Sequence, residues 1–174
     1  GAGQTWTGGP TADAATGVIE NELYQLTVAA RGAITSWLDK TRANRQFARN
    51  IGGYYLNDLG ASSGTLSIEN AGPVSITLKA TAAGPLAHTT RVTLVRGLAR
   101  VDIRNEITQN FGDLHKWRFG FEITAPDVWH EEVGAIIRAK LLANGGHYSP
   151  TNARYDWLTL NHFADVSGGG VGVT

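Results

Sequence analysis

The chain has 174 residues, a length that predicts one domain with a sizeable hydrophobic core. Fifteen Lys and Arg balance fifteen Asp and Glu, so the net charge of zero argues against a protein that binds nucleic acid. Cysteine is absent, which excludes disulfides, zinc–thiolate sites and thiol catalysis, and no apolar run is long enough for a membrane helix.

Residues 1–17 predict a linker or a loosely ordered arm. They contain Gly9-Pro10 and many small residues without periodicity, and Trp6 is the side chain expected to pin them to the body. No charged segment followed by an apolar segment opens the chain, so no signal peptide is visible, which slightly favours a cytoplasmic protein. An alternating pattern has only just begun at residues 168–174, and we therefore expect a fragment of a longer protein.

Residues 18–174 predict a single antiparallel β-sandwich domain. Short runs with strand composition or period-two alternation cover residues 23–29, 33–38, 45–48, 66–68, 74–80, 90–95, 99–107 and 116–123. Such alternation places one face of each strand inward and the other in water. Several such strands separated by turn residues predict an all-β fold, either a sandwich or a barrel.

The segment from residue 128 to residue 142 allows two interpretations. Trp129, Val133 and Ile136 fit helical spacing, and the acidic residues precede the basic ones as they do in a helix. Gly134 in the middle of the segment weakens a helix. The residues alone leave helix and strand open.

No motif in the chain predicts catalysis or a metal site. The five histidines form no metal-binding pair, and His130-Glu131-Glu132, the nearest approach to a ligand cluster, is explained by a solvated polar turn. Asp102, Glu106 and Glu122 lie on the polar faces of the expected strands, which explains them without a glycosidase pair. We therefore expect no catalytic residue and no metal ligand within this chain.

Two glycine-rich loops are candidate sugar contacts. Residues 52–58 place Tyr54 near Asp58, and residues 145–152 place Tyr148 among small and polar residues. Sugars are bound by aromatic faces together with planar polar groups. The alternative is that these tyrosine rings are ordinary packing at the bases of loops.

Several segments together resemble the C-terminal β-sandwich domain of family 38 glycoside hydrolases, the retaining, zinc-dependent α-mannosidases. They follow the family's order and comprise residues 18–24, 32–40, 52–56, 113–119, 136–138 and 148–151. The first two read as I-E-N-E, a strand, and then G-x-I-x-S-x-x-D-K. A similar opening occurs in other sandwiches of the galactose-mutarotase-like type.

The resemblance implies part of a large supersandwich, supporting a catalytic domain of the same polypeptide. It places the zinc, the nucleophile and the acid/base carboxylate in segments upstream of this domain. The chain would then hold no cofactor, be inactive alone and contact a mannoside-like carbohydrate. The resemblance also implies strand, not helix, at residues 128–142.

Two site residues follow from the resemblance. Tyr54, with Tyr55 as the fallback, matches the tyrosine that reaches toward the substrate, and Arg138 matches an arginine that faces the active-site cleft. Asp58 and Tyr148, from the two loops above, complete the predicted sugar-contacting set. The chain departs from the family's pattern at Gly53, Ala139 and His147.

Two other functions stay open beside this accessory domain, which itself predicts a large apolar patch where a catalytic domain packs. A stand-alone carbohydrate-binding module predicts an exposed shelf of coplanar aromatic rings, from Trp129, Tyr148, Tyr155 and Trp157. A mutarotase-like or lyase-like enzyme predicts a pocket in which a histidine faces a carboxylate, the candidates being His115 or His147 with Glu122 or Asp156.

Overall fold

The structure is a computed structural model that describes residues 8–153 and 162–174. The described residues form β-strands and two single-turn 3-10 helices, and all the paired strands are antiparallel. The predicted all-β, antiparallel class is therefore confirmed. The chain divides into two compact units, residues 1–122 and residues 123–174. Within the described part of the chain, no helix has the length and apolar character needed to cross a membrane.

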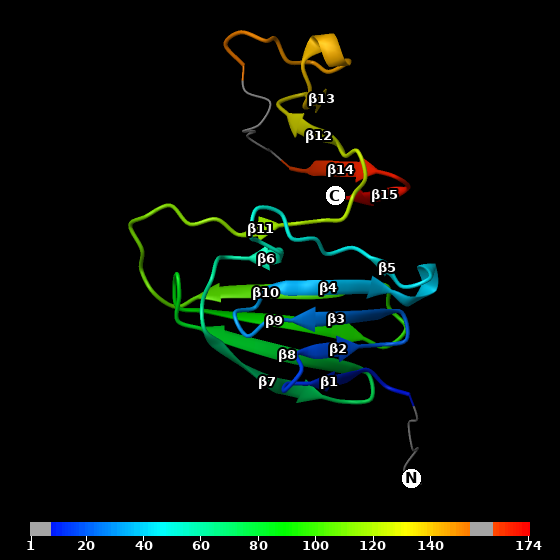
Figure 1. Cartoon of the computed structure of the whole chain (residues 1–174), viewed down its shortest axis with the longest axis vertical. Helices are drawn as coiled ribbons and strands as arrows, with labels where there is room; N and C mark the ends of the chain where they lie inside the picture. The colour runs from blue at the N-terminus through cyan, green and yellow to red at the C-terminus, as the bar shows by residue number, and fades with distance from the viewer. Residues whose placement is uncertain (1–7, 154–161) are drawn as a thin grey trace. The chain divides into compact units, whose positions relative to one another are not determined.

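The first unit contains a seven-stranded sheet with the strand order β1-β2-β3-β4-β6-β11, and β5 pairs with β4 off this path (Figure 1). Its strands are β1 (Thr11–Asp13), β2 (Val18–Glu20), β3 (Tyr24–Val28), β4 (Ile34–Asp39), β5 (Arg45–Gln46), β6 (Leu56–Asp58) and β11 (Arg118–Phe119). A 3-10 turn, Lys40–Arg42, follows β4, and the Asp39 side chain caps it by accepting a hydrogen bond from the Thr41 amide.

A four-stranded sheet forms the second layer of the same unit, in the order β10-β9-β8-β7. Its strands are β7 (Gly64–Ala71), β8 (Ser75–Ala82), β9 (His88–Val95) and β10 (Val101–Ile107). Alternate residues of β8 and β9 are buried, as the period-two pattern predicts. In Figure 1 these green strands lie behind the blue strands of the first sheet, which gives the two-layer sandwich.

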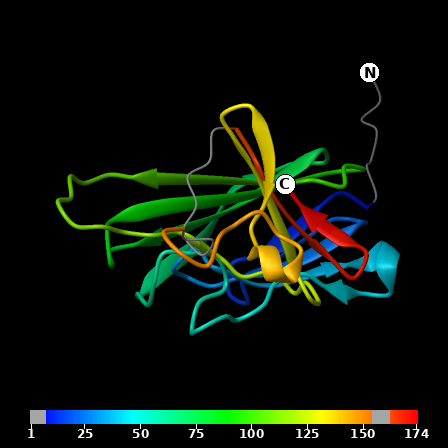
Figure 2. The ribbon, with the colours of Figure 1, turned by 90° about the horizontal axis from the view of Figure 1, so that it is seen from above.

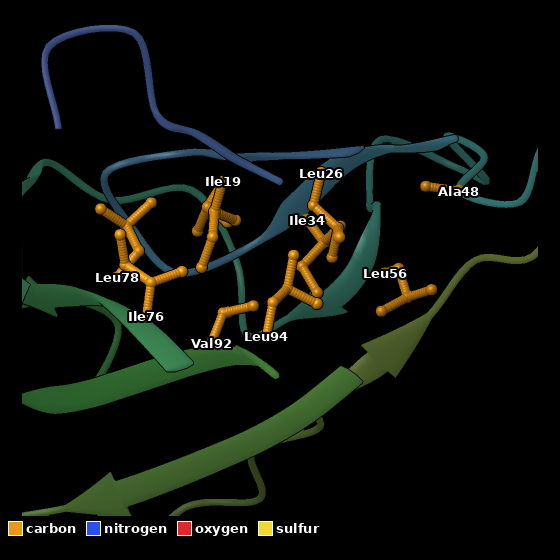
Figure 3. Close-up of a cluster of buried hydrophobic side chains, with 10 residues drawn as sticks. Ile19, Leu26, Ile34, Ala48, Leu56, Ile76, Leu78, Val92 and Leu94 are labelled. Carbon is orange, nitrogen blue, oxygen red and sulfur yellow. The ribbon is translucent and has the colours of Figure 1, made fainter. Parts of the chain in front are cut away.

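Aliphatic side chains from both sheets form the core of the sandwich (Figure 3). Ile19, Leu26 and Ile34 of the first sheet lie opposite Leu78 and Leu94 of the second. Asn21 adds a polar connection between the layers, because its side-chain amide donates to the carbonyl oxygens of Val95 and Leu98. The core thus lies wholly within the first unit.

At one end of the sandwich the core becomes polar. Asn57 and Asn105 exchange side-chain hydrogen bonds of 3.1 and 2.6 Å, and Thr90 donates to Asn105 at 2.7 Å. The two ring nitrogens of the buried His88 lie 2.7 Å from the Leu86 carbonyl oxygen and 3.0 Å from the Arg31 carbonyl oxygen. These contacts fix the loops at this end of the two sheets.

The second unit contains a four-stranded sheet in the order β13-β12-β14-β15. Its strands are β12 (Asp127–Glu132), β13 (Ala135–Arg138), β14 (Ala164–Gly168) and β15 (Val171–Val173), and a second 3-10 turn spans Leu142–Asn144. Figures 1 and 2 show the hairpin of β12 and β13 in yellow and the hairpin of β14 and β15 in red. Residues 128–142 are thus mainly strand, as the family resemblance implied, and the helical interpretation is wrong.

Two segments differ from the sequence expectation. Residues 11–13, expected within the arm, form β1, because their backbone pairs with residues 18–20. The expected strand at residues 116–123 is reduced to β11, Arg118–Phe119, whose register with β6 shifts between its two residues. Of the alternating residues 116–123, only Arg118 and Phe119 form a strand, and Phe121 forms an isolated bridge with Ala48.

Candidate functional site

An open cleft of about 430 Å³ lies in the first unit, at the polar end of the sandwich. Its walls come from the loops that flank β6, β8 and β11, and its lining residues are Tyr54, Leu59, Gly60, Ala61, Pro85, Leu114, His115, Lys116 and Arg118. Tyr54, the residue predicted to reach a sugar, therefore faces a surface hollow. A second hollow of about 440 Å³ is lined by small residues, and none of the described residues in its wall is aromatic or charged.

Asp58 lies beneath this cleft instead of in it. Its side chain is 1% exposed, and its two oxygens accept hydrogen bonds from the Arg31 guanidinium at 3.0 and 2.8 Å. The same oxygens accept from the backbone amides of Tyr55 at 3.0 Å and Gly60 at 3.1 Å. Asp58, predicted as a sugar contact, instead fixes the loop between Tyr54 and Gly60.

Burial of Asp58 by itself raises the pKa of its carboxyl group. The hydrogen bonds from Arg31, Tyr55 and Gly60 outweigh burial, so the pKa of Asp58 is lowered below its ordinary value. Asp58 is therefore an ionised carboxylate whose charge is balanced by Arg31.

Arg118 lies directly over Tyr54. The guanidinium carbon is 3.6 Å from the centroid of the tyrosine ring, which is a close cation–π contact. The two residues meet because Arg118 pairs with Asp58 across β11 and β6, and the Gly120 amide donates to the Tyr55 carbonyl oxygen. Gly120 is required here, since a Cβ at this position would lie 2.2 Å from the Arg49 carbonyl oxygen.

The charged side chains that line the cleft are basic. Lys116 and Arg118 are in the wall beside His115, and the described residues that line the cleft include no Asp or Glu. The sequence analysis named His115 only as a candidate of the mutarotase-like or lyase-like hypothesis, and it named neither Lys116 nor Arg118 as a site residue. One sequence feature could have indicated this wall: His115, Lys116 and Arg118 lie within four positions of the chain.

Arg138, the second residue taken from the resemblance, lies in the second unit and is bound by Asp127. Its guanidinium donates to Asp127 at 2.8 Å and to the Gly145 carbonyl oxygen at 2.9 Å, and its Cζ lies 5.6 Å from the Trp129 ring centroid. Hydrogen bonds from Arg138, and then from Lys140, hold the pKa of Asp127 well below its usual range. Arg138 therefore belongs to an ion-pair cluster on the β12–β13 hairpin.

Tyr148 joins a polar chain in the same unit. Its hydroxyl lies 2.9 Å from Nε2 of the fully buried His130 and donates to Glu132 at 3.1 Å. Burial, and then the hydrogen bond to Glu132, raise the pKa of Tyr148. The hydroxyl of Tyr148 is thus occupied by two partners of its own chain.

The predicted residues fall into two pairs. Tyr54 and Asp58 lie together in the first unit, one lining the cleft and the other supporting it. Arg138 and Tyr148 lie in the second unit, where the amide of residue 148 donates to the carbonyl oxygen of Lys140. The side chains of Arg138 and Tyr148 both contact residues of β12, Arg138 at Asp127 and Tyr148 at His130 and Glu132.

The aromatic shelf of the binding-module hypothesis is not coplanar in its described half. Trp129 contacts Arg138 and His147, whereas Tyr148 contacts His130. Because consecutive residues of a strand point to opposite faces, the groups around Trp129 and those around His130 lie on opposite faces of β12. Tyr155 and Trp157 lie outside the described residues.

The histidine–carboxylate pairs of the third hypothesis take other partners. Glu122 pairs with Arg49 at 3.4 Å, and the His115 ring packs edge-on against Phe111. His147 accepts a hydrogen bond from the Arg138 amide. Asp156 lies outside the described residues, as does Trp6. Among the residues that the structure describes, no group of three or more His, Cys, Asp and Glu side chains is arranged to hold a metal ion.

Comparison with known proteins adds no relative: no protein-family model matches the chain, and a search of curated proteins finds no match. The class that the structure itself defines is an antiparallel β-sandwich followed by a small β-sheet unit.

Proposed function

We propose that the chain is a non-catalytic accessory domain of a carbohydrate-active protein of the family 38 α-mannosidase type, and that it contacts a glycan through the Tyr54 cleft. The observation that carries the proposal is the position of Tyr54. The resemblance selects this residue as the one that reaches the substrate, and Tyr54 lines an open cleft with polar walls. Hydrolysis, with zinc holding sugar hydroxyls, belongs to the catalytic domain of the parent protein.

Exposed apolar side chains support the accessory role. Ile107, Phe111, Leu114 and Phe119 are exposed on one segment between the end of β10 and β11, and Leu114 is 76% exposed. Such a concentration of apolar side chains is typical of a surface that another domain covers. An accessory domain that supports a catalytic domain needs such a surface.

The test is a titration of the chain with α-linked mannose disaccharides and other short glycans, followed by protein NMR. We expect weak, roughly millimolar binding that shifts the amide signals of residues 54–61, because many sugar contacts lie in the parent protein. Tyr54→Ala is expected to abolish the shifts. Val74→Ala, a change at a 61% exposed residue outside the cleft, is the matched control and keeps them.

An aryl α-mannoside assay with added zinc completes the test. No turnover is expected from this chain, since none of its described side chains forms a glycosidase carboxylate pair around the cleft. Turnover would overturn the accessory role. Unchanged glycan binding in Tyr54→Ala would overturn the assignment of the cleft.

A stand-alone carbohydrate-binding module is the second candidate. It is favoured by the fact that all residues lining the cleft lie within one compact unit. The two candidates differ in how glycan affinity changes in the parent protein. An accessory domain predicts affinity at least about tenfold higher in the parent than in this chain, whereas a module predicts equal affinities.

A further inference from the structure

We propose that the sugar unit bound in the Tyr54 cleft carries a carboxylate, and that Arg118 binds this carboxylate. The proposal rests on the proposed function, because it names the class of sugar for the same cleft. Four features of the cleft support the proposal. They are the positive charge of its walls, the orientation of Arg118, the contact of Arg118 with the Tyr54 ring, and the ion pair that balances the charge of Asp58.

The cleft carries positive charge, although the net charge of the whole chain is zero. Fifteen Lys and Arg balance fifteen Asp and Glu in the whole sequence, yet the described residues that line the cleft include the Arg118 guanidinium and no acid. A concave surface lined by charges of one sign raises the local concentration of the opposite charge. The cleft therefore favours an anionic ligand over a neutral one.

Arg118 is arranged to bind a planar anion. Its Cζ lies 3.6 Å from the Tyr54 ring centroid, a separation too short for an N–H group to point at the ring, so the contact uses the π face of the cation. The N–H donors of a guanidinium lie in its plane and point away from its edge, where they match the two oxygens of a carboxylate. Among the described residues, Arg118 has no carboxylate partner, whereas Arg31 and Arg138 each bind one.

The same contact removes one face of the Tyr54 ring from sugar stacking. A sugar without charge is held largely by the apolar face of an aromatic ring. One face of Tyr54, the aromatic residue of the cleft, is covered by Arg118. A ligand on this side of the ring therefore meets the Arg118 guanidinium instead of the tyrosine face.

Asp58 does not oppose an anion in the cleft. Its carboxylate is buried beneath the loop and carries a two-point ion pair with Arg31 at 2.8 and 3.0 Å. The negative charge closest to Tyr54 in the sequence is thus compensated before a ligand arrives.

The experiment compares two trisaccharides that differ only at C6, a β-1,4-linked mannuronate trimer and the β-1,4-linked mannose trimer. We expect the mannuronate trimer to bind the chain at least about tenfold more tightly, because a hydrogen bond between charged partners is stronger than a neutral one. This preference is expected to fall as salt is added. A sulfated mannose trimer serves as a further arm and, lacking a planar carboxylate, is expected to bind more weakly than the mannuronate.

Arg118→Gln tests the anchor, and Arg100→Gln is the matched control. Arg100 is 66% exposed, does not line the cleft and pairs with Asp102, so its loss removes the same charge elsewhere. We expect Arg118→Gln to abolish the preference for mannuronate while the weak binding of the neutral trimer persists. Arg100→Gln keeps the preference. Near-ultraviolet circular dichroism confirms that each variant is folded.

The outcomes separate this proposal from the proposed function. Equal binding of the two trimers, tighter binding of the sulfated trimer, or a mannuronate preference that survives in Arg118→Gln overturns the carboxylate assignment alone. Binding of the α-linked mannose disaccharides without binding of the mannuronate trimer also overturns the carboxylate assignment alone. Absence of binding by the trimers and by the α-linked disaccharides overturns the proposed glycan contact and the assignment together.

Discussion

Asp58 is the residue on which the shape of the cleft depends. Its carboxylate holds Arg31 from the β3–β4 turn and the amides of Tyr55 and Gly60 from its own loop. These contacts cover both ends of the segment that presents Tyr54. A carboxylate with four donors and 1% exposure has no room for a ligand.

Replacing Asp58 by Asn leaves Arg31 without its ion-pair partner in a half-buried position. We expect a loss of about 3 kcal/mol in the free energy of unfolding, measured with urea, because removal of one member of a buried pair leaves the other uncompensated. Asp102→Asn is the matched control, since Asp102 is 46% exposed and its pair with Arg100 lies at the surface. A similar small effect in both variants would contradict the structural role of Asp58.

The stability of the chain is also expected to depend on pH through Asp58. The pKa of this carboxyl is lowered in the folded chain from the ordinary value of 3.8, so folding favours its ionised form. The resulting stabilisation is fully present above the unfolded pKa and is lost as the pH falls through the folded pKa. The stability difference between wild type and Asp58→Asn should stay constant from about pH 7 to pH 5 and shrink below about pH 4. A difference that persists undiminished well below pH 3 would contradict it.

Individual site residues were predictable to different degrees. Tyr54 is the tyrosine that the family pattern picks out after a glycine pair, and it lines the cleft. Asp58 was predicted as a sugar contact, but its side chain is buried against Arg31. The sequence does not reveal this, because Arg31 lies 27 positions away and local composition does not report burial. The sequence analysis did not single out Arg118, because its place beside Tyr54 comes from the pairing of β11 with β6, in which Arg118 and Asp58 are 60 residues apart.

Among the elements, period-two alternation predicted the central strands well and the edges poorly. β8 and β9 bury alternate side chains, which is the signal that the sequence carries. Residues 116–123 alternate as regularly, yet only Arg118–Phe119 is strand, and Phe119 is 51% exposed. An alternating pattern forms a strand where a second layer covers its apolar face. The sequence does not show at which residue that layer ends.

The β12–β13 hairpin illustrates a competition between helix and strand signals. Residues 127–142 have the charge order of a helix, but Gly134 has φ of +80° and forms the turn together with Val133. A residue in this left-handed region ends a helix and permits a two-residue hairpin. Glycine, which weakened the helical interpretation, was the decisive signal in this segment.

Gly134→Ala is expected to loosen this hairpin. A Cβ at this position meets nothing within 4 Å, so the cost is that of backbone strain at positive φ, about 1 kcal/mol. Hydrogen exchange of the amides in β12 and β13 measures the effect. Gly112→Ala is the control, because its Cβ also meets nothing within 4 Å and its φ is not in the left-handed region. Equal acceleration of exchange in the two variants would argue against strain at the turn.

For the molecule as a whole, the two compact units differ in how much hydrophobic core each contains. The sequence predicts one domain over residues 18–174, and the contacts divide this span after residue 122. The core cluster of buried aliphatic side chains lies entirely within residues 19–94. In the described part of the second unit, Ile123 and Ala139 are the buried hydrophobic residues. The first unit therefore contains its own hydrophobic core, whereas the second is held by backbone pairing and ion pairs.

We therefore expect residues 1–122 to fold alone and residues 123–174 to remain unfolded alone. A chain of about 50 residues that buries so few apolar side chains gains too little from burial to offset its conformational entropy. In the shortened chain, the two-dimensional amide NMR spectrum should retain the dispersed signals of β2 to β10 at nearly their positions in the full chain. The peptide 123–174 should give the narrow spectrum of an unfolded chain. An unfolded 1–122 fragment would show that the second unit completes the core, and a dispersed 123–174 spectrum would show that polar pairing alone sustains a small sheet.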